Sequence, residues 1–259
     1  MDHFAHRLRH REQLLGYWVM LDSPYATERL AAIGYDYVAI DAQHGLVSYD
    51  GMVRALSAID AGAALGPTRT VGVVRVESGE PTPIGKALDA GATAVIVPLV
   101  DTAEQAAAAV RAARYPPDGI RSFGPLRSQL RIGPVPADTD DQTAVLAMIE
   151  TATGLAAVEE ICETPGLDGI YVGPSDLSIG IGGRFAGDPA VAHAFEAALA
   201  RIALAAERAG VAAGIHTDDG ATARRRLDQG YTFATVAADL SHLELAARDH
   251  LRIARPAAG

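Results

Sequence analysis

One local pattern occurs four times in this chain and constrains its fold more than any other feature of the sequence. In each copy, an alanine-rich stretch with helical patterning ends at a glycine and runs directly into a short apolar segment. The four copies are residues 31–41, 88–98, 207–216 and 227–239. A glycine just past a helix C-terminus adopts the left-handed conformation that ends the helix, and these apolar segments are too short and continuous for surface helices. Each copy therefore predicts a helix, a glycine cap and a buried strand.

Four further apolar segments have the same strand-like character, so the predicted strands number eight. These segments are residues 14–21, 70–76, 144–150 and 168–173. Helical patterns lie between and after the strands, at about residues 26–33, 48–62, 83–90, 102–114, 153–163, 190–209, 218–229 and 240–253. Continuous apolar strands that alternate with helices are typical of a parallel sheet covered by helices.

Eight such units predict an α/β fold of the (β/α)8 TIM-barrel type. A barrel of this kind needs about 250 residues, so the 259 residues of the chain are expected to form a single domain, residues 1–259. Five or six units would instead indicate an open, doubly wound sheet. No G-x-G-x-x-G pattern follows the first predicted strand, which argues against the dinucleotide-binding version of that fold.

One long stretch, residues 115–141, fits neither the helical nor the strand pattern. It contains five prolines and three arginines. A connection of this length without regular structure is typical of a lid, a subunit contact or a mobile excursion. The sequence predicts such a loop here and leaves these three roles open.

Charge and cysteine content narrow the classes of partner. The net charge is −10, with a pI near 5.2, which removes the electrostatic attraction to nucleic acid or to an anionic membrane surface. Cys162 is the only cysteine, so an internal disulfide framework and a cysteine-rich zinc site are excluded. No apolar run reaches the length of a membrane helix, and the first residues contain no signal-peptide pattern. We therefore expect a cytoplasmic protein that binds neither nucleic acid nor membrane.

Polar residues stand at the carboxyl ends of several predicted strands. Asp41 ends the second strand and is followed by Gln43 and His44; the third strand carries Arg75, the fifth ends in Glu150, and the sixth runs into Gly173, Pro174, Ser175 and Asp176. In a TIM barrel the carboxyl ends of all strands meet at one face, where the active site lies. These side chains are therefore expected to share one mouth.

Glu150 and Asp176 are the predicted metal ligands. Two carboxylates on adjacent strands, with no cysteine or histidine beside them, form the oxygen-only environment that suits Mg²⁺ or Mn²⁺. Each residue taken alone has a simpler interpretation. Glu150 would form a salt bridge to a nearby arginine, and Asp176 would serve as a helix N-cap.

His44, Asp41 and Arg75 are the predicted catalytic residues. The carboxylate of Asp41 is close enough in sequence to orient the His44 imidazole and raise its basicity, as a general base requires. Arg75 ends a buried strand, and its planar guanidinium matches a carboxylate or a developing enolate. The backbone amides of residues 173–176 open a predicted helix and suit a substrate carboxylate.

Several other residues are weaker candidates. Trp18, in the first strand, is interpreted as barrel packing or as a wall of the pocket. His216 and Asp239 end the seventh and eighth strands and could line the mouth, although neither is assigned a chemical step. The histidines at positions 3, 6 and 10 have helical spacing and are expected to form a solvated face, and Cys162 is expected to be a small buried hydrophobe.

The set of motifs resembles the HpcH/HpaI aldolases across nearly the whole chain. The matching stretches are GYDYVAIDAQHG, VVRV, VPLVDTAEQAAAAVRAARYPPDGIRSFG, MIET and TPGLDGIYVGPSDLS. This family comprises metal-dependent class II pyruvate aldolases of the 2,4-dihydroxyhept-2-ene-1,7-dioate aldolase type. The resemblance implies a TIM barrel of the phosphoenolpyruvate/pyruvate type.

The resemblance also implies roles for the residues at the mouth. Glu150 and Asp176 would hold a divalent cation, Mg²⁺ or Mn²⁺ in the first place and Co²⁺ or Zn²⁺ as alternatives. His44, supported by Asp41, would be the acid and base, and Arg75 would stabilise the enolate oxygen. The substrate would contact Ser175 and the amides around it, with Gly173, Pro174, Trp18 and Gln43 also at the binding site.

Two single residues bear on this assignment. Lys86 is the only lysine, and it falls near the start of a predicted helix, outside the barrel, so a Schiff-base aldolase is not expected. Gln43 stands where family members typically have glutamate. Because Gln43 cannot be anionic, this position cannot order metal-bound water through charge, and the preferred aldehyde can differ as well.

The expected activity is reversible cleavage of a 4-hydroxy-2-oxo acid to an aldehyde and pyruvate, or hydroxypyruvate. Two alternatives are a related metal-enolate lyase, such as an oxaloacetate decarboxylase or a citryl-CoA-lyase-like enzyme, and a non-enzymatic barrel that binds 2-oxo acids. The resemblance further implies a homohexamer in which paired barrels exchange the C-terminal helix, residues 240–253.

Overall fold

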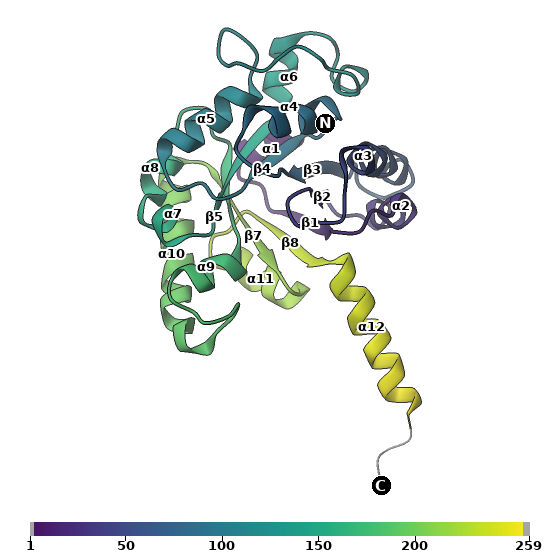
Figure 1. The fold of residues 1–259 in the computed structure, drawn as a ribbon, viewed down its shortest axis with the longest axis vertical. Coiled ribbons are helices and arrows are strands. Elements are labelled where there is room, and N and C mark those ends of the chain that lie inside the picture. Colours follow the sequence, from purple (N-terminus) through teal and green to yellow (C-terminus); the bar gives the residue numbers. More distant parts are fainter. Residues whose placement is uncertain (1–2, 256–259) are drawn as a thin grey trace.

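A computed structural model describes residues 3–255 and shows a closed barrel of eight parallel strands (Figure 1). The strands are paired in chain order, and the eighth closes on the first. They are β1 (Leu14–Val19), β2 (Tyr37–Asp41), β3 (Val71–Arg75), β4 (Ala94–Val97), β5 (Ala144–Ile149), β6 (Gly169–Val172), β7 (Ala212–Thr217) and β8 (Phe233–Ala238). All eight predicted strands are present, and the predicted TIM-barrel fold is confirmed.

The helices alternate with the strands around the barrel, and short elements stand beside the predicted set. They are α1 (Phe4–Arg9), α2 (Pro24–Ala31), α3 (Tyr49–Ala63), α4 (Pro81–Asp89), α5 (Ala103–Ala113), η1 (Ser128–Leu130), α6 (Pro136–Gln142), α7 (Ala152–Ala156), α8 (Val158–Cys162), α9 (Pro174–Gly180), η2 (Pro189–Val191), α10 (Ala192–Ala209), α11 (Gly220–Asp228) and α12 (Asp239–Ala254).

The glycine caps that defined the repeat have the expected backbone conformation. Gly34, Gly91, Gly210 and Gly230 all have positive φ, between 75° and 119°. A residue with a Cβ adopts such angles only with strain, so glycine is favoured where each helix turns into the following strand.

Aromatic rings fill the inside of the barrel, and glycines make room for them. The ring of Phe233 lies where a Cβ on Gly214 would be only 2.1 Å away, and Tyr37 has the same relation to Gly16. The hydroxyls of Tyr37 and Tyr171 both bond to Thr235, at 2.7 and 2.6 Å, so the phenol groups are satisfied although fully buried.

The N-terminal segment differs from the predicted solvated face. It forms α1, which buries Phe4, Ala5 and Leu8 in the same apolar cluster as the barrel interior. His3 and His10 are exposed, as expected, but His6 is half-buried and bonds to Asp141 of α6 at 2.8 Å. The apolar positions between the histidines therefore decided the packing of this helix.

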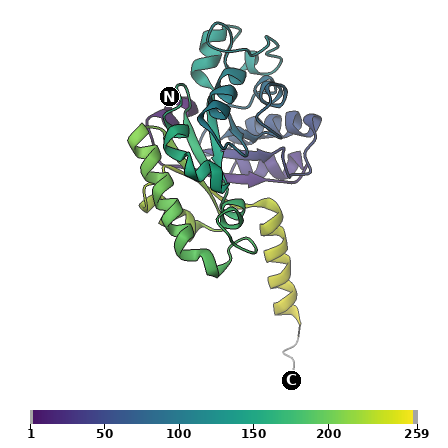
Figure 2. The same cartoon turned by 60° about the vertical axis from the view of Figure 1, so that its left-hand side comes forward.

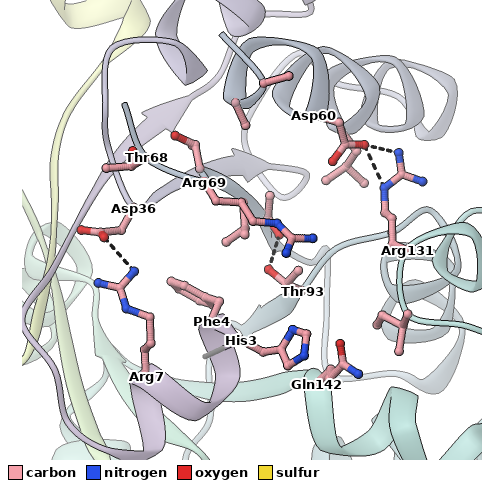
Figure 3. Close-up of a pocket in the computed structure, with 18 of the residues that line it drawn as sticks. His3, Phe4, Arg7, Asp36, Asp60, Thr68, Arg69, Thr93, Arg131 and Gln142 are labelled. Atoms are coloured by element: carbon pink, nitrogen blue, oxygen red, sulfur yellow. Dashed lines mark hydrogen bonds and ion pairs between the residues drawn. The ribbon is translucent and has the colours of Figure 1, made fainter. Parts of the chain in front are cut away.

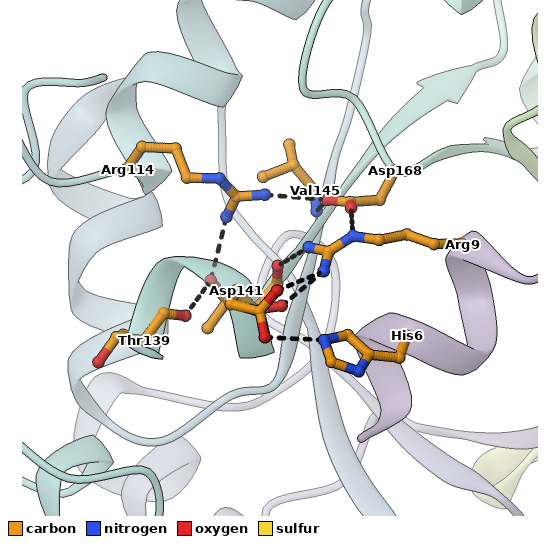
Figure 4. A network of polar contacts seen from close by, with 8 residues as sticks. His6, Arg9, Arg114, Thr139, Asp141, Val145 and Asp168 are labelled. Atoms are coloured by element: carbon orange, nitrogen blue, oxygen red, sulfur yellow. Dashed lines mark hydrogen bonds and ion pairs between the residues drawn. The ribbon is translucent and has the colours of Figure 1, made fainter. Parts of the chain in front are cut away.

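A network of polar contacts ties α1 to the segment before β5 and to β6 (Figure 4). Arg9 donates from Nε to Asp168 at 2.6 Å and from Nη1 to the Asp141 carbonyl at 2.6 Å. Arg114 donates to the other oxygen of Asp168, at 3.1 Å, and to the Thr143 hydroxyl. The network fixes the amino-terminal face of the barrel, which in this fold contributes to stability rather than to catalysis.

The predicted loop at residues 115–141 is partly wrong. It contains η1 and α6, and Arg127 of this stretch donates to Asp60 of α3 at 2.5 Å. The predicted helix at 153–163 is divided into α7 and α8 at Ala157. The many prolines led to the prediction of a loop. Proline is also compatible with the first turn of a helix, however, as Pro136 of α6 shows.

The two longest helices relate differently to the barrel. The segment Pro189–Ala209, which includes α10, is long and apolar enough to cross a membrane by length and composition, but α10 packs against α8 and β7. Helix α12 extends away from the barrel in both views (Figures 1 and 2). Of its residues only Asp239 is buried.

Candidate active site

The predicted site residues come from the carboxyl ends of four strands around the mouth of the barrel. Asp41 and Arg75 end β2 and β3, and Glu150 directly follows β5. Asp176 lies in the first turn of α9, directly after β6, and His44 lies in the loop after β2. Parallel strands in register bring these chain segments to one face of the barrel.

Asp41 and Arg75 form a buried pair at the base of this mouth. The guanidinium Nε donates to Oδ1 of Asp41 at 2.9 Å, and Nη2 donates to Oδ2 at 2.5 Å. Burial opposes ionisation of Asp41, but the hydrogen bonds and charge of Arg75 outweigh it and hold the pKa of Asp41 below its usual value. Asp41 therefore remains an anion that fixes the plane of the guanidinium.

Trp18 completes the packing around this pair. Its Nε1 donates to Oδ2 of Asp41 at 3.3 Å, and Arg75 Cζ lies 5.0 Å from the centre of the indole ring. Trp18 also stacks on Tyr171 at 5.9 Å and contacts His216 edge to face at 5.3 Å. Both interpretations of Trp18 are therefore compatible with its position, because it packs inside the barrel and supports Arg75.

The contact of Asp41 with His44 differs from the expected one. Oδ1 of Asp41 accepts from the backbone N–H groups of Gln43, at 3.0 Å, and His44, at 3.1 Å. No hydrogen bond among the described residues joins the carboxylate to the imidazole, which is exposed. Asp41 thus shapes the loop that carries His44 and makes no hydrogen bond to the ring.

Glu150 is buried without a cationic partner. Glu150 is 3 % exposed, and its Oε1 accepts a hydrogen bond from the Leu99 N–H at 2.8 Å. Burial raises the pKa of Glu150, and the charge of Asp176 raises it further against the opposing effects of the Leu99 amide and Arg75. No ion pair of Glu150 occurs in residues 3–255, so the simpler interpretation of a structural salt bridge does not apply.

The segment after β6 lies against this carboxylate. A Cβ on Gly173 would approach Oε2 of Glu150 to 2.7 Å, so only glycine leaves the space that this oxygen occupies. The N-cap of α9 is Gly173 and makes no side-chain cap, and Ser175 and Asp176 are exposed. Asp176 therefore does not serve as the N-cap, which was its simpler interpretation.

The residues present fit a hard divalent cation. Burial and the charge of Asp176 both disfavour the anionic form of Glu150. A cation bound by the two carboxylates would stabilise that form. Within the described residues no group of three or more His, Cys, Asp or Glu side chains could hold a metal. Glu150 and Asp176 would thus supply two oxygen ligands, which suits a cation that keeps several waters.

Two further polar groups face this region. Oε1 of Gln43 is buried and has no hydrogen-bond partner. His216 lies one residue before the end of β7, and burial lowers the pKa of its imidazole to about 4, so the ring is neutral at physiological pH. Asp239 has no free role at the mouth, since it accepts the N–H groups of Met20 and Leu21 at 2.9 and 3.1 Å.

Leu99 is a residue of the site that the sequence did not reveal. It has φ of 56°, unusual for a residue with a branched side chain, and its side chain is exposed. This conformation aims its amide at Glu150. The neighbouring Asp101 accepts the hydroxyl of Thr151, which ties the loop after β4 to the loop after β5. No glycine or asparagine marks the position in the sequence, so nothing signalled a left-handed residue.

The only lysine lies outside the barrel, as predicted. Lys86 is exposed on α4, and Nζ lies 5.3 Å from the centre of the Tyr49 ring. A cavity of about 920 Å³ lies away from the mouth, near α1 and the start of β3. The chemistry-bearing residues are nevertheless gathered at the mouth, as is usual for TIM barrels.

The fold and the site together define a TIM-barrel protein with two carboxylates and a fixed guanidinium at its catalytic face. The sequence model of the HpcH/HpaI aldolase/citrate lyase family matches residues 14–246. The chain belongs to this family.

Relatives of known name cover almost the whole chain. The chain is 41% identical over 253 residues to a hydroxypyruvate/pyruvate aldolase of Roseovarius nubinhibens, covering 96% of this chain and 95% of the relative. It is 36% identical over 253 residues to a 4-hydroxy-2-oxovalerate aldolase of Rhodococcus jostii, covering 94% and 92%. Among solved structures, a member of the same family from Burkholderia cenocepacia is 37% identical with a TM-score of 0.87, covering 97% and 98%.

Proposed function

We propose that this chain is a class II aldolase that reversibly cleaves a 4-hydroxy-2-oxo acid to an aldehyde and pyruvate or hydroxypyruvate. Family membership and relatives named as aldolases at 36 to 41% identity support a carbon–carbon lyase. The observation that carries the proposal is the unpaired, buried Glu150 beside Asp176 and Arg75. Such an arrangement costs stability unless it holds something positively charged.

We propose that Glu150 and Asp176 would hold a divalent cation, Mg²⁺ or Mn²⁺, with Co²⁺ and Zn²⁺ as alternatives. When bound, the cation supplies Lewis acidity, which favours negative charge on a substrate oxygen. The Leu99 amide holds one oxygen of Glu150 and leaves Oε2 beside Gly173. Glu150 is in this way oriented before any ligand arrives.

Arg75 stabilises the charge that develops on the substrate. In cleavage, the bond between C3 and C4 breaks and its electron pair moves toward the C2 oxygen, giving an enolate. Asp41 holds Nε and Nη2 of Arg75, whereas Nη1 makes no hydrogen bond among the described residues. A guanidinium fixed in this way needs little reorganisation when the oxygen becomes negative, which is the main source of electrostatic catalysis.

His44 moves the proton. Its exposed imidazole takes the proton from the C4 hydroxyl, directly or through water, as the aldehyde leaves. Protonation of C3 of the enolate then gives the 2-oxo acid. We propose that the hydroxyl of Ser175 and the backbone N–H groups of Ser175 and Asp176 hold the substrate carboxylate, with Gly173 and Pro174 in the same turn.

The remaining residues at the mouth affect which substrates fit. Gln43 carries a buried Oε1 without a partner, so a ligand with a hydroxyl group could donate to it. Hydroxypyruvate has such a group and pyruvate does not. Trp18 forms the apolar wall behind Arg75.

We further propose a cytoplasmic homo-oligomer, a hexamer by family resemblance, that acts on small molecules. In support, α12 leaves the barrel and exposes leucine and isoleucine side chains along its length. The exposed residues are Leu240, Leu243, Leu245, Leu251 and Ile253. A second copy of the chain would cover them.

The test is metal-dependent exchange of the pyruvate methyl protons into deuterated water. We expect exchange with Mg²⁺, Mn²⁺ or Co²⁺ and none after chelation or in Glu150→Gln. Absence of exchange in folded protein with all three metals would contradict the proposal. Calorimetric binding of pyruvate without exchange would indicate the non-enzymatic barrel, and decarboxylation of oxaloacetate without use of aldehyde would indicate the alternative lyase.

A further inference from the structure

An open cavity of about 920 Å³ lies away from the mouth, beside α1, the C-terminal half of α3 and the amino end of β3 (Figure 3). Its walls come from segments far apart in sequence, and include Arg7, Asp36, Asp60, Arg69, Arg131 and Gln142. The volume is in the range of sites that hold a whole metabolite. The proposed aldolase reaction uses none of these residues.

The carboxylates of this cavity already have partners. Asp36 accepts from Arg7 at 2.9 Å and from the Leu15 N–H at 2.8 Å. Glu12 accepts from Nε of Arg7 at 2.7 Å. Asp60 accepts from Nη2 of Arg127 at 2.5 Å and from Nε of Arg131 at 2.8 Å. Little acceptor capacity is left to bind a cation.

The donors, in contrast, are in excess on one side of the cavity. Asp60 is shared by two guanidinium groups, and burial together with the charge of Arg131 holds the pKa of Arg127 below its usual value. Arg69 makes no hydrogen bond or ion pair within residues 3–255, and neither does the amide of Gln142. Figure 3 shows the Arg69 side chain crossing the cavity toward Thr93.

The opposite side has the reverse balance. Arg7 is the single guanidinium bound to both Glu12 and Asp36, so this end of the cavity is slightly acidic. An anion would be repelled from this end and attracted toward Arg69 and Arg131. The cavity is therefore polarised, and the free guanidinium lies on its positive side.

We propose that this cavity is a second binding site, separate from the catalytic mouth, for a small anion that carries two or more carboxylate or phosphate groups. Arg69 binds one group with its planar fork, which matches the two oxygens of a carboxylate or phosphate. Arg131 and Gln142 meet a second group across the cavity. A singly charged acid engages only one of these donors and binds weakly.

The site adjoins the strands that carry the catalytic pair. Val71 and Gly72, at the start of β3, line the cavity, and Arg75 ends the same strand. Asp36 lines it directly before β2, which ends in Asp41. A ligand bound here therefore contacts the supports of Asp41 and Arg75 without entering the mouth.

Calorimetry on the metal-free full chain tests the proposal, with citrate and pyrophosphate as probes and acetate as the singly charged control. Ionic strength is held constant, because contacts between exposed charges are screened by salt. We expect at least one polyanion to bind and acetate not to bind. Binding of citrate alone would indicate a carboxylate ligand, and binding of pyrophosphate alone a phosphate ligand.

Variants separate this cavity from the mouth. Arg69→Ala is expected to weaken polyanion binding at least tenfold, whereas Arg75→Ala leaves it unchanged. Arg29→Ala, an exposed arginine on α2 outside the cavity, is the matched control and is expected to bind as the wild type does. Because Arg69 is exposed, Arg69→Ala should unfold at the wild-type temperature.

Three results would overturn the proposal. In the first, neither citrate nor pyrophosphate binds to the wild type. In the second, Arg69→Ala binds the polyanion as tightly as the wild type does. In the third, Arg75→Ala loses binding and Arg69→Ala retains it. The last would assign the anion to the catalytic mouth. None of these measurements depends on aldolase turnover, so failure of this proposal is distinguishable from failure of the proposed function.

Discussion

Asp41 and Arg75 face each other in register on neighbouring strands and are joined by two hydrogen bonds, at 2.9 and 2.5 Å. The pair is nearly closed to solvent, and Trp18 packs over it. The backbone N–H groups of Gln43 and His44 donate hydrogen bonds to the same carboxylate. A single aspartate thus fixes both the guanidinium and the loop that carries the proposed base.

Replacing this aspartate should reduce activity and stability together. In Asp41→Asn, the amide cannot neutralise Arg75, and leaving a buried charge unpaired typically costs about 3–5 kcal/mol. We expect a lower melting temperature and a fall in kcat/KM of about 100-fold or more, since Arg75 loses its fixed orientation. Thermal unfolding and steady-state kinetics measure the two effects.

Asp50→Asn is the control for that substitution. Asp50 pairs with Arg54 on the surface of α3, where an ion pair contributes about 0–1 kcal/mol. Its melting temperature and activity should match those of the wild type. If Asp41→Asn left kcat/KM unchanged, the orientation of Arg75 by Asp41 would not contribute to catalysis.

Glu150 should make the metal-free protein less stable as the pH rises. Its pKa is raised by burial above the usual 4.5, so the folded state holds this proton more tightly than the unfolded state does. Stability attributable to this group is therefore present below pH 4.5 and is lost as the pH rises through the folded pKa. Urea unfolding of chelated protein across this range measures the effect.

Glu150→Gln should abolish that pH dependence and should also abolish metal binding. The amide keeps the shape of the side chain without its charge. Titration with Mn²⁺ should give saturable binding to the wild type at pH 7 and none to the variant. A variant that still binds Mn²⁺ with wild-type affinity would place the cation elsewhere.

His44→Ala should lower kcat and leave stability unchanged. The imidazole is exposed, and surface substitutions typically change stability by less than about 0.5 kcal/mol. Loss of a general base lowers the rate by about 10²- to 10⁴-fold. The control is His10→Ala, another exposed histidine, near the end of α1. Equal activity of both variants would rule out His44 as the base.

Two substitutions of Leu99 should differ in their effect on Mn²⁺ binding. Glycine tolerates φ of 56° and retains the N–H, so Leu99→Gly should keep Mn²⁺ affinity. A β-branched residue resists this conformation, so Leu99→Val should cost about 1–2 kcal/mol and weaken Mn²⁺ binding, because the amide turns away from Glu150. Thermal unfolding and metal titration distinguish the two. Identical Mn²⁺ affinities would show that the amide does not orient the carboxylate.

Replacing apolar residues of α12 with charged ones should reduce the number of subunits in the assembly. Leu243 and Leu251 are exposed, although both are apolar. In Leu243→Asp combined with Leu251→Asp, a partner would have to bury two carboxylates, so light scattering should show smaller particles than the wild type. Glu244→Gln with Arg252→Gln, on the same helix, is the control. An unchanged mass for the aspartate variant would exclude α12 from the interface.

Much of the barrel could be predicted because its signals are local. A glycine such as Gly210 ends a helix by its own conformational freedom, and an apolar run such as residues 144–149 is buried on both faces. The residues of the mouth could be found because the fold places every strand end on one face. Position in the pattern was therefore enough to find Asp41, Arg75 and Glu150.

The missed features depend on contacts between distant segments. Helix α1 is short, and its helical form depends on burying Phe4 and Leu8 against the barrel interior. The direction of the Asp41 hydrogen bonds is set by how the loop after β2 turns back on itself. The Leu99 conformation is held by its bond to Glu150, 51 positions away in the chain. None of these leaves a pattern in neighbouring residues.

The rings of Tyr37, Tyr171 and Phe233 occupy the barrel axis, and the space they need is left by glycines. A molecule in the cavity near α1 cannot diffuse through such an interior to reach the mouth. Communication between the two ends would have to be mechanical, as a small displacement of β2 or β3 along its own length. The closed packing of the barrel thus makes its two faces separate compartments that share only their walls.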